Sequence, residues 1–315
     1  MRLETADRLK GLCIVLMIVG HCAISSSLHD AIYLFHIPLF FFVSGYFLKS
    51  GAFSQKVVLD CRRLLVPYAL GIALVSLKYG VDAVRLNDAS SLVRYWVSAV
   101  VVGPNIDFAM WEDVIVGPIW FLLALFWGRV FLQALSRFRF GGVYAIVLGV
   151  VVCSLPTGVV LPLGLQQGFS ALAFMGLGYE LAHNSGILVC RWSWPVSVVL
   201  VVPALWIPSL DMYLGLYPIP VVNVIVSMGA IVFLWKAWYL LENKKWMWLG
   251  MVSYLGRISL LVLLVHYYEA MTFDWYAKLE ALPAALIPVL RVAVDLVAAS
   301  LLAKVPLVRK VLCLK

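Results

Sequence analysis

The feature that most constrains this chain is a succession of long apolar stretches that extends from its beginning to its end. A transmembrane α-helix needs about 20 mainly apolar residues. Stretches of that kind lie near 9–28, 31–48, 57–78, 113–135, 141–156, 163–183, 195–209, 217–241, 255–274 and 283–303. The sequence therefore predicts an all-α, polytopic integral membrane protein with about ten transmembrane helices.

Composition agrees with this class. Of 315 residues, 64% are hydrophobic and 13% are charged, and the mean hydropathy is +1.00, too apolar for a water-soluble domain. The net charge of +8 arises from scattered residues and not from basic runs, so it does not predict nucleic-acid binding. We interpret the six cysteines as apolar packing residues, because their spacing fits neither a disulfide framework nor a metal site.

The distribution of basic residues predicts the topology. With the N-terminus placed inside, the inner segments carry 19 of the 24 Lys and Arg residues, and the outer segments and last span carry 5. This follows the positive-inside rule and predicts that both termini are cytoplasmic. We expect residues 1–315 to form a single membrane domain, with an extracytoplasmic loop near 79–112 that contains Asp107, Glu112 and Asp113. The first apolar stretch weakly resembles a signal peptide, but Glu4 and Asp7 before it favour a retained span.

Ionisable residues inside the spans are the best functional candidates, since a charge in hydrocarbon is costly and usually faces a cavity or a partner. Lys10 and His21 are eleven residues apart in the first span, which on a helix places them on one face and about 16 Å apart. His36 and His266 lie in the second and ninth spans. Each histidine could instead be a packed structural residue.

Two further groups are read in two ways. Arg62 and Arg63, at the start of the third span, could be membrane-interface anchors or, together with Lys10, a basic mouth for phosphates. Arg291 and Asp295 are four residues apart in the last span, so we expect them to neutralise each other as a structural pair.

The motifs, taken in order, resemble those of the membrane acyltransferase-3 family, whose bacterial members include O-acetyltransferases of surface polysaccharides and a fucose 4-O-acetylase-like branch. The pieces are Asp7-Arg8-Leu9-Lys10-Gly11 with His21, Phe35-His36-Ile37-Pro38 through Ser44-Gly45-Tyr46, Arg62-Arg63-Leu64 with Pro67-Tyr68, Ile119-Trp120-Phe121-Leu122, Phe174-Met175-Gly176-Leu177-Gly178-Tyr179, and Leu255-Gly256-Arg257-Ile258-Ser259 with His266. Lys10 departs from the pattern, because the family often has arginine there. The resemblance covers nearly the whole chain.

This resemblance implies transfer of an acyl group, usually acetyl, from cytoplasmic acyl-coenzyme A to a hydroxyl of a carbohydrate or lipid-linked glycan, in a bacterial cytoplasmic (inner) membrane. We expect His21 to remove the hydroxyl proton, because a histidine titrating near 6.5 suits this task. Asp7, three residues before Lys10 on the same helix face, could orient Lys10 or tune the charge at the entry. Lys10, Arg62 and Arg63 would bind acyl-CoA (acetyl-CoA). His36 would bind the acceptor, hold the thioester carbonyl or relay a proton.

Several alternatives stay open from the sequence. Trp120, Ser259 and His266 are possible acceptor or structural residues, and no metal is expected. His21 could be acylated transiently, which would make the reaction two-step. The acceptor could be a lipid, a peptidoglycan sugar or a small molecule, and a proton-linked transporter or flippase is the competing class.

Overall fold

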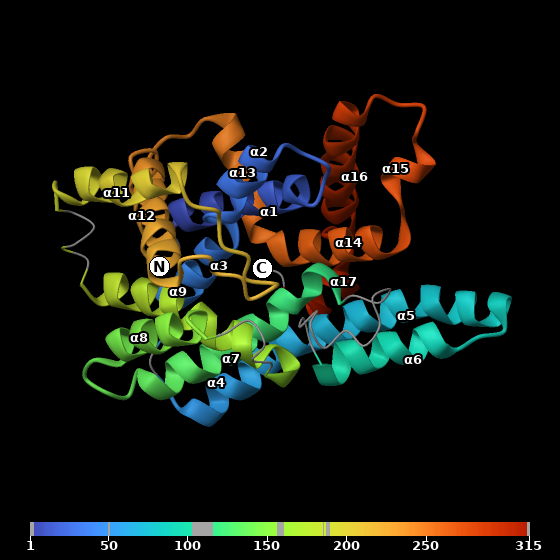
Figure 1. The fold of residues 1–315 in the computed structure, drawn as a ribbon, viewed down its shortest axis with the longest axis horizontal. Coiled ribbons are helices and arrows are strands. Elements are labelled where there is room, and N and C mark those ends of the chain that lie inside the picture. Colours follow the sequence, from blue (N-terminus) through green and yellow to red (C-terminus); the bar gives the residue numbers. More distant parts are fainter. Residues whose placement is uncertain are drawn as a thin grey trace.

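The chain folds into an assembly of helices. The computed structural model describes residues 3–49, 51–102, 116–155, 161–184, 186 and 190–313. Its first half contains α1 (Glu4–Gly20), α2 (Ser26–Tyr33), α3 (His36–Tyr46), α4 (Phe53–Asp60), α5 (Val66–Leu86), α6 (Ser90–Val97), α7 (Trp120–Leu135) and α8 (Gly141–Cys153). Its second half contains α9 (Leu165–His183), α11 (Ser193–Val201), α12 (Pro220–Tyr239), α13 (Met247–Arg257), α14 (Ser259–Thr272), α15 (Trp275–Lys278), α16 (Ile287–Leu302) and α17 (Pro306–Val311). Over these residues the predicted all-α class is confirmed (Figure 1).

All ten predicted apolar stretches are largely helical, but they differ in length. Within the described residues, five helical segments are long and apolar enough to cross a membrane: 26–46, 53–86, 117–135, 220–239 and 284–302. The pair α13 and α14, bent by 70° at Ile258, adds a sixth if it forms one broken span. The chain is thus a multi-pass helical membrane protein, whereas ten spans and cytoplasmic termini stay predictions.

Two predicted boundaries are wrong. The first span was expected to continue to residue 28, but α1 ends at Gly20 and His21 is its C-cap, so this histidine lies at a helix end and not at the centre of a helix. The segment after residue 79 was expected to be a loop, but α5 continues to Leu86 and α6 follows it. The acidic residues Asp107, Glu112 and Asp113 lie outside the described residues.

Helix α1 crosses α13 at very short range. A Cβ at Gly11 would lie 1.9 Å from the carbonyl oxygen of Val252, and one at Gly256 would lie 1.7 Å from that of Asp7. Small residues of this kind let two helix backbones touch, which is how helices commonly pack in membranes. Gly11 and Gly256, both from the motif pieces, therefore fix where α1 stands in the fold.

The N-terminus of α1, predicted to lie on the cytoplasmic side, is capped and anchored by the segment that follows α12. Glu242, just after α12, accepts hydrogen bonds from the backbone N–H groups of Glu4 (2.9 Å) and Thr5 (2.6 Å), and a carboxylate is favourable at a helix N-terminus. The buried Arg8 donates to the carbonyls of Leu241 (2.5 Å) and Lys244 (3.1 Å). These bonds hold α1 firmly at the end remote from His21.

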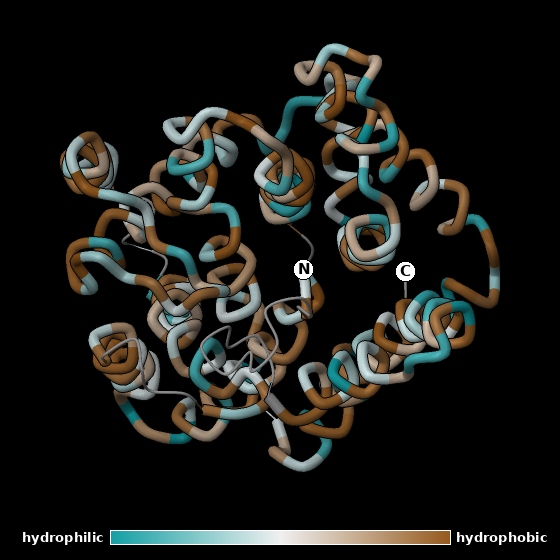
Figure 2. The backbone as a smooth tube through the Cα atoms, turned by 45° about the vertical axis from the view of Figure 1, so that its right-hand side comes forward, coloured by the Kyte–Doolittle hydropathy of each residue, from teal (hydrophilic) through white to brown (hydrophobic). Residues whose placement is uncertain are grey.

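The remaining helices pack around this centre and present an apolar exterior. Helix α9 packs against α3, α7 and α8. Helices α5 and α6 lie side by side, whereas α14 runs across the lower end of α16 (Figure 1). Hydrophobic residues predominate along the helices (Figure 2). Many large apolar side chains are exposed, among them Leu77, Val84 and Val289, as expected of a surface that faces lipid.

Candidate active site

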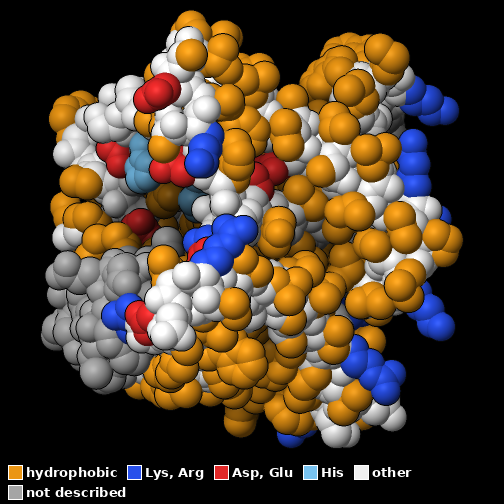
Figure 3. Space-filling view, turned by 90° about the vertical axis from the view of Figure 1, so that its right-hand side faces the viewer, with side chains coloured by type: hydrophobic (Ala, Val, Ile, Leu, Met, Phe, Trp, Pro, Cys, Tyr) orange, Lys and Arg blue, Asp and Glu red, His pale blue; other side chains and the backbone are white. Residues whose placement is uncertain are grey.

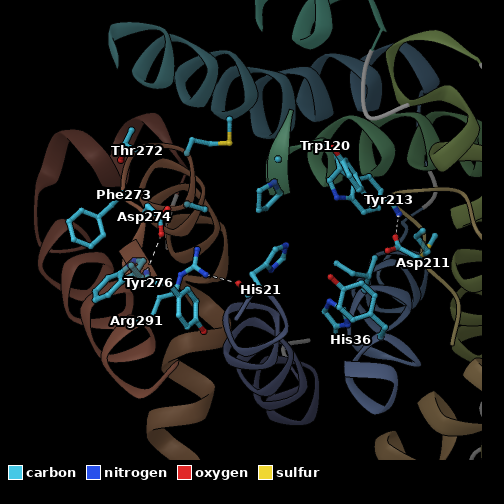
Figure 4. Close-up of a pocket in the computed structure, with 18 of the residues that line it drawn as sticks. His21, His36, Trp120, Asp211, Tyr213, Thr272, Phe273, Asp274, Tyr276 and Arg291 are labelled. Carbon is cyan, nitrogen blue, oxygen red and sulfur yellow. Dashed lines mark hydrogen bonds between the residues drawn. The ribbon is translucent and has the colours of Figure 1, made fainter. Parts of the chain in front are cut away.

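A large cavity opens where the ends of α1, α7 and α14 meet α2, α16 and the segment before α12. It has a volume of about 630 Å³. His21, Trp120, Tyr213 and Arg291 line it and point toward its interior (Figure 4). On the surface, Figure 3 shows a hollow in which histidine side chains are visible, surrounded by acidic and basic groups within a mostly hydrophobic face. A hollow that combines apolar walls with a few charged and polar groups is typical of a small-molecule binding site.

A second, smaller cavity of about 90 Å³ shares His21 and Trp120 with the first. It extends along α1 in the direction of Lys10, because Met17 and Ile14 line it one and two turns before His21. Phe40, Leu263 and Ser259 complete much of its wall. His21 therefore stands at the junction of a large cavity with both polar and apolar walls and a small apolar one.

The hydrogen bonding of His21 defines its chemistry. Its Nδ1 lies 2.7 Å from the carbonyl oxygen of Met17. A carbonyl oxygen only accepts, so Nδ1 carries the hydrogen and donates it. In the neutral ring the lone pair that can accept a proton is therefore on Nε2. The His21 side chain is exposed to the large cavity. His21 has the tautomer that a general base requires.

His36 shows the same bonding with a different exposure. Its Nδ1 donates to the Ile32 carbonyl at 2.8 Å, and its ring meets that of Tyr33 edge to face at 4.9 Å between centroids. It also lines the large cavity, but only 1% of it is exposed. This burial makes His36 a less accessible base than His21.

His266 does not line either cavity but lies behind His21. Their ring centroids are 5.1 Å apart. His266 is completely buried, and its Nδ1 donates to Asp295 at 2.8 Å and lies 3.2 Å from a Glu269 oxygen. His266, predicted as a possible acceptor or structural residue, thus packs against the His21 ring from outside both cavities.

The expected pairing of Arg291 with Asp295 is wrong. Arg291 bonds Glu269 through Nε at 3.0 Å and donates through a terminal nitrogen to the carbonyl oxygen of His21 at 2.7 Å (Figure 4). Asp295 instead accepts from His266. The i,i+4 spacing predicted a local pair, but partners on α14 and α1 come close enough to replace it.

One group of ligand-type atoms could also hold a metal ion. Single donor atoms of His266, Glu269 and Asp295 lie within 4.8 Å of one another, but each already takes part in the hydrogen bonds described above, and the Arg291 cation contacts Glu269. A neighbouring cation disfavours another one. The absence of a metal requirement stays a prediction.

The wall opposite Arg291 is aromatic and acidic, and sequence reasoning missed most of it. Asp211 accepts backbone N–H groups from Tyr213 (2.8 Å) and Leu214 (3.1 Å), while burial raises the pKa of its carboxyl. Tyr213 contacts Trp120, with ring centroids 5.9 Å apart. Asp211 and Tyr213 belong to a loop without a motif, so only the fold reveals them, whereas Trp120 begins α7 and was a predicted candidate. Glu269 was detectable, because it follows His266 by one helical turn inside a predicted span.

The predicted donor-binding residues lie elsewhere. Lys10 forms an ion pair with Asp7 at 2.8 Å, as the i,i+3 spacing suggested. Arg62 and Arg63 are exposed in a π-helical turn, Cys61–Leu65, between α4 and α5. None of these four residues lines either of the two cavities, and their role in binding acyl-CoA stays a prediction.

The fold and the site together define a multi-pass membrane protein with a histidine between two cavities. Residues 4–302 match the acyltransferase domain family Acyl_transf_3, so the chain belongs to the acyltransferase-3 family and is a membrane acyltransferase. A search of curated proteins and one of solved structures found no similar protein.

Proposed function

We propose that this protein transfers an acetyl group from acetyl-CoA to a hydroxyl of a carbohydrate acceptor, with His21 as general base. The observation that carries the proposal is the position of His21 at the junction of the two cavities, with Nδ1 bonded to Met17. This arrangement supports a site where an acceptor from the large cavity meets a thioester from the small one.

The proposed reaction follows from the free Nε2. This nitrogen takes the proton of the acceptor hydroxyl while the hydroxyl oxygen attacks the thioester carbonyl. The carbon–sulfur bond then breaks, the ester forms, and the imidazolium returns its proton to the thiolate. Direct transfer uses only one ring nitrogen of His21, which fits the engagement of the other with Met17.

The size of the small cavity supports acetyl as the acyl group. Its volume of about 90 Å³ is small beside the 630 Å³ of the large cavity. A space of this size favours a two-carbon acyl group over a long fatty chain. Its apolar lining matches the methyl end of an acetyl group.

The large cavity supports a carbohydrate acceptor. Aromatic rings such as Trp120 and Tyr213 offer flat apolar faces to the carbon–hydrogen side of a sugar, and the Asp211 carboxylate accepts hydrogen bonds from sugar hydroxyls. Sites for polar ligands combine such apolar walls with a few placed polar groups.

The positions of the two ends of α1 support approach of the two substrates from opposite sides of the membrane. If the positive-inside orientation holds, Lys10 lies at the cytoplasmic end of α1, where acyl-CoA is available, and the large cavity opens toward the outer side. Lys10, Arg62 and Arg63 then bind the phosphates of coenzyme A. The acceptor reaches His21 from outside.

The test measures transfer of labelled acetyl from acetyl-CoA in membranes containing the protein, with products separated into polysaccharide, lipid and small-molecule fractions. We expect label in the polysaccharide fraction, loss of transfer in His21→Ala, and unchanged transfer in His183→Ala, an exposed histidine at the end of α9. Normal transfer by His21→Ala would refute the general base. Label in no fraction, with flux driven by a pH gradient, would favour a transporter.

Arg62→Ala tests the donor site separately. We expect a higher KM for acetyl-CoA with little change in kcat, because an exposed cation that binds a phosphate contributes to binding and not to the chemical step. An unchanged KM would remove Arg62 from the donor site.

A further inference from the structure

The small cavity contains one polar side chain that the reaction proposed above does not use. Ser259 lines this cavity, is partly exposed, and carries the only hydroxyl among the described residues of the cavity wall. Its hydroxyl makes no hydrogen bond to a described residue. An unpaired hydroxyl is unfavourable in apolar surroundings. This group is therefore available to a ligand that enters the cavity.

The break between α13 and α14 explains why this hydroxyl has no partner within its own helix. A helical serine commonly bonds the carbonyl four residues earlier, as Ser76 does with Ile72 at 2.7 Å. Ser259 is the first residue of α14, whereas α13 ends at Arg257 and is bent from α14 by 70°. The carbonyl four residues before Ser259 therefore belongs to a helix with a different axis.

Ser259 lies at the end of the small cavity that is remote from His21. His21 and Trp120 line both cavities, whereas Ser259 lines only the small one. Along α14, Ser259 precedes His266 by seven residues, and the ring of His266 is 5.1 Å from that of His21. Seven residues make about two helical turns, so Ser259 and His266 share one face and are about 10 Å apart along the axis. The cavity therefore extends about two turns from His21 to Ser259.

The Ser259 end of the cavity is also the end nearer to the N-terminus of α1. Gly256, three residues before Ser259, touches α1, since a Cβ at Gly256 would lie 3.0 Å from the backbone nitrogen of Gly11. Gly11 directly follows Lys10. In the proposed orientation this is the side from which acyl-CoA arrives, so the donor passes Ser259 before its thioester reaches His21.

The covalent structure of acyl-CoA has an amide at the matching depth. From the thioester carbonyl carbon, coenzyme A continues through sulfur and two methylene groups to an amide, whose nitrogen is four bonds away and whose carbonyl oxygen is six bonds away. In an extended chain these atoms are about 5 and 7 Å from the thioester carbon. That carbon stands about 4–5 Å from Nε2 of His21, because the attacking hydroxyl oxygen lies between them. The amide therefore lies about 10 Å from His21, as Ser259 does.

We propose that Ser259 binds the amide of coenzyme A that is closest to the thioester. Its hydroxyl donates a hydrogen bond to the amide carbonyl oxygen. This contact sets the depth at which the thioester carbonyl stands beside His21. The proposal rests on the transferase activity proposed above, and it makes Ser259 a donor-binding residue and not an acceptor-binding one.

The test compares two small labelled donors in membranes that contain the protein and its acceptor. S-acetyl-N-acetylcysteamine contains this amide, and S-pentyl thioacetate has a chain of the same length without it. We expect Ser259→Ala to lower kcat/KM for the amide donor about 3- to 10-fold, the effect of one lost hydrogen bond between neutral groups. The value for the pentyl donor should not change, which also shows that the variant is folded. Acetyl-CoA should behave like the amide donor.

Two further variants serve as controls. Ser259→Thr keeps the hydroxyl and should retain the wild-type preference for the amide donor. Ser136→Ala removes the hydroxyl of another partly buried serine at a helix end, one that bonds the Gln133 carbonyl at 2.9 Å and lines neither cavity. It should resemble the wild type with both donors.

The outcomes separate this inference from the proposed function. An equal fall with both donors in Ser259→Ala would assign Ser259 a structural role, and no fall with either would show that it does not bind the amide. Both results would overturn the inference and leave the proposed function standing, provided that the wild type transfers acetyl from acetyl-CoA. A wild type that transfers acetyl from none of the three donors would refute the proposed function and this inference together.

Discussion

The small cavity predicts how the protein selects its acyl donor. Leu263 of α14 lines this cavity, whereas its neighbour Leu264 is equally buried, at 6% exposure, but does not line it. Leu263→Ala enlarges the space beside His21. We expect this variant to accept butyryl-CoA better relative to acetyl-CoA.

The size of the change follows from burial. Butyryl has two methylene groups more than acetyl, and each buried methylene contributes about 0.8 kcal/mol. Two of them contribute about 1.6 kcal/mol, which corresponds to a shift of about 15-fold in the ratio of kcat/KM values. Leucine to alanine removes three carbon atoms, so the space created is sufficient for both groups.

The assay compares kcat/KM for butyryl-CoA and acetyl-CoA in the wild type, Leu263→Ala and Leu264→Ala. Leu264→Ala makes the same chemical change on the same helix and should leave the ratio unchanged, although both variants lose stability, by about 2–5 kcal/mol. An equal shift in both variants, or no shift in Leu263→Ala, would refute the assignment of this cavity to the acyl group.

Three predictions concern the fold, each measured as a shift in the unfolding of the purified protein in detergent. Gly256→Ala should destabilise the protein by about 1–3 kcal/mol or more, because the added methyl group meets a backbone carbonyl. The control Gly250→Ala, with no atom within 4 Å of its Cβ, should be neutral or stabilising by up to about 1 kcal/mol. Equal effects of the two substitutions would refute the close crossing of α1 and α13. Glu242→Gln should lower the stability by about 0.5–2 kcal/mol, because the N-terminus of α1 loses its charged cap. A loss that does not depend on salt concentration would argue against an electrostatic contribution of this carboxylate. Arg129→Met should lower the stability by about 3–5 kcal/mol, because it leaves the buried Asp60 without its ion-pair partner at 2.9 Å. A change below about 1 kcal/mol would show that this ion pair contributes no more than one on the surface.

Much of the fold was predictable from local sequence. Each predicted apolar stretch contains a helix, because residues that must hide their backbone groups in hydrocarbon have little alternative. The boundaries were less predictable. The ends of α1 at Gly20 and of α5 at Leu86 depend on what packs around them, and hydropathy does not report packing.

The candidate site divides in a similar way. Spacing alone correctly paired Asp7 with Lys10, since both are on one turn of one helix. The same reasoning failed for Arg291 and Asp295, whose partners Glu269 and His266 come from another helix. Local spacing shows which pairs are possible, and tertiary contacts decide which of them form.

The sequence by itself determined the membrane class, the family motifs and the presence of His21, because these depend on composition and on order along the chain. Only the tertiary structure decided that His21 stands between two cavities, that a loop with Asp211 and Tyr213 forms part of one wall, and that His266 lies behind His21 with two carboxylates. The reason is physical. The direction of a proton acceptor and the charge around it depend on groups that are distant in sequence and meet only when the helices pack.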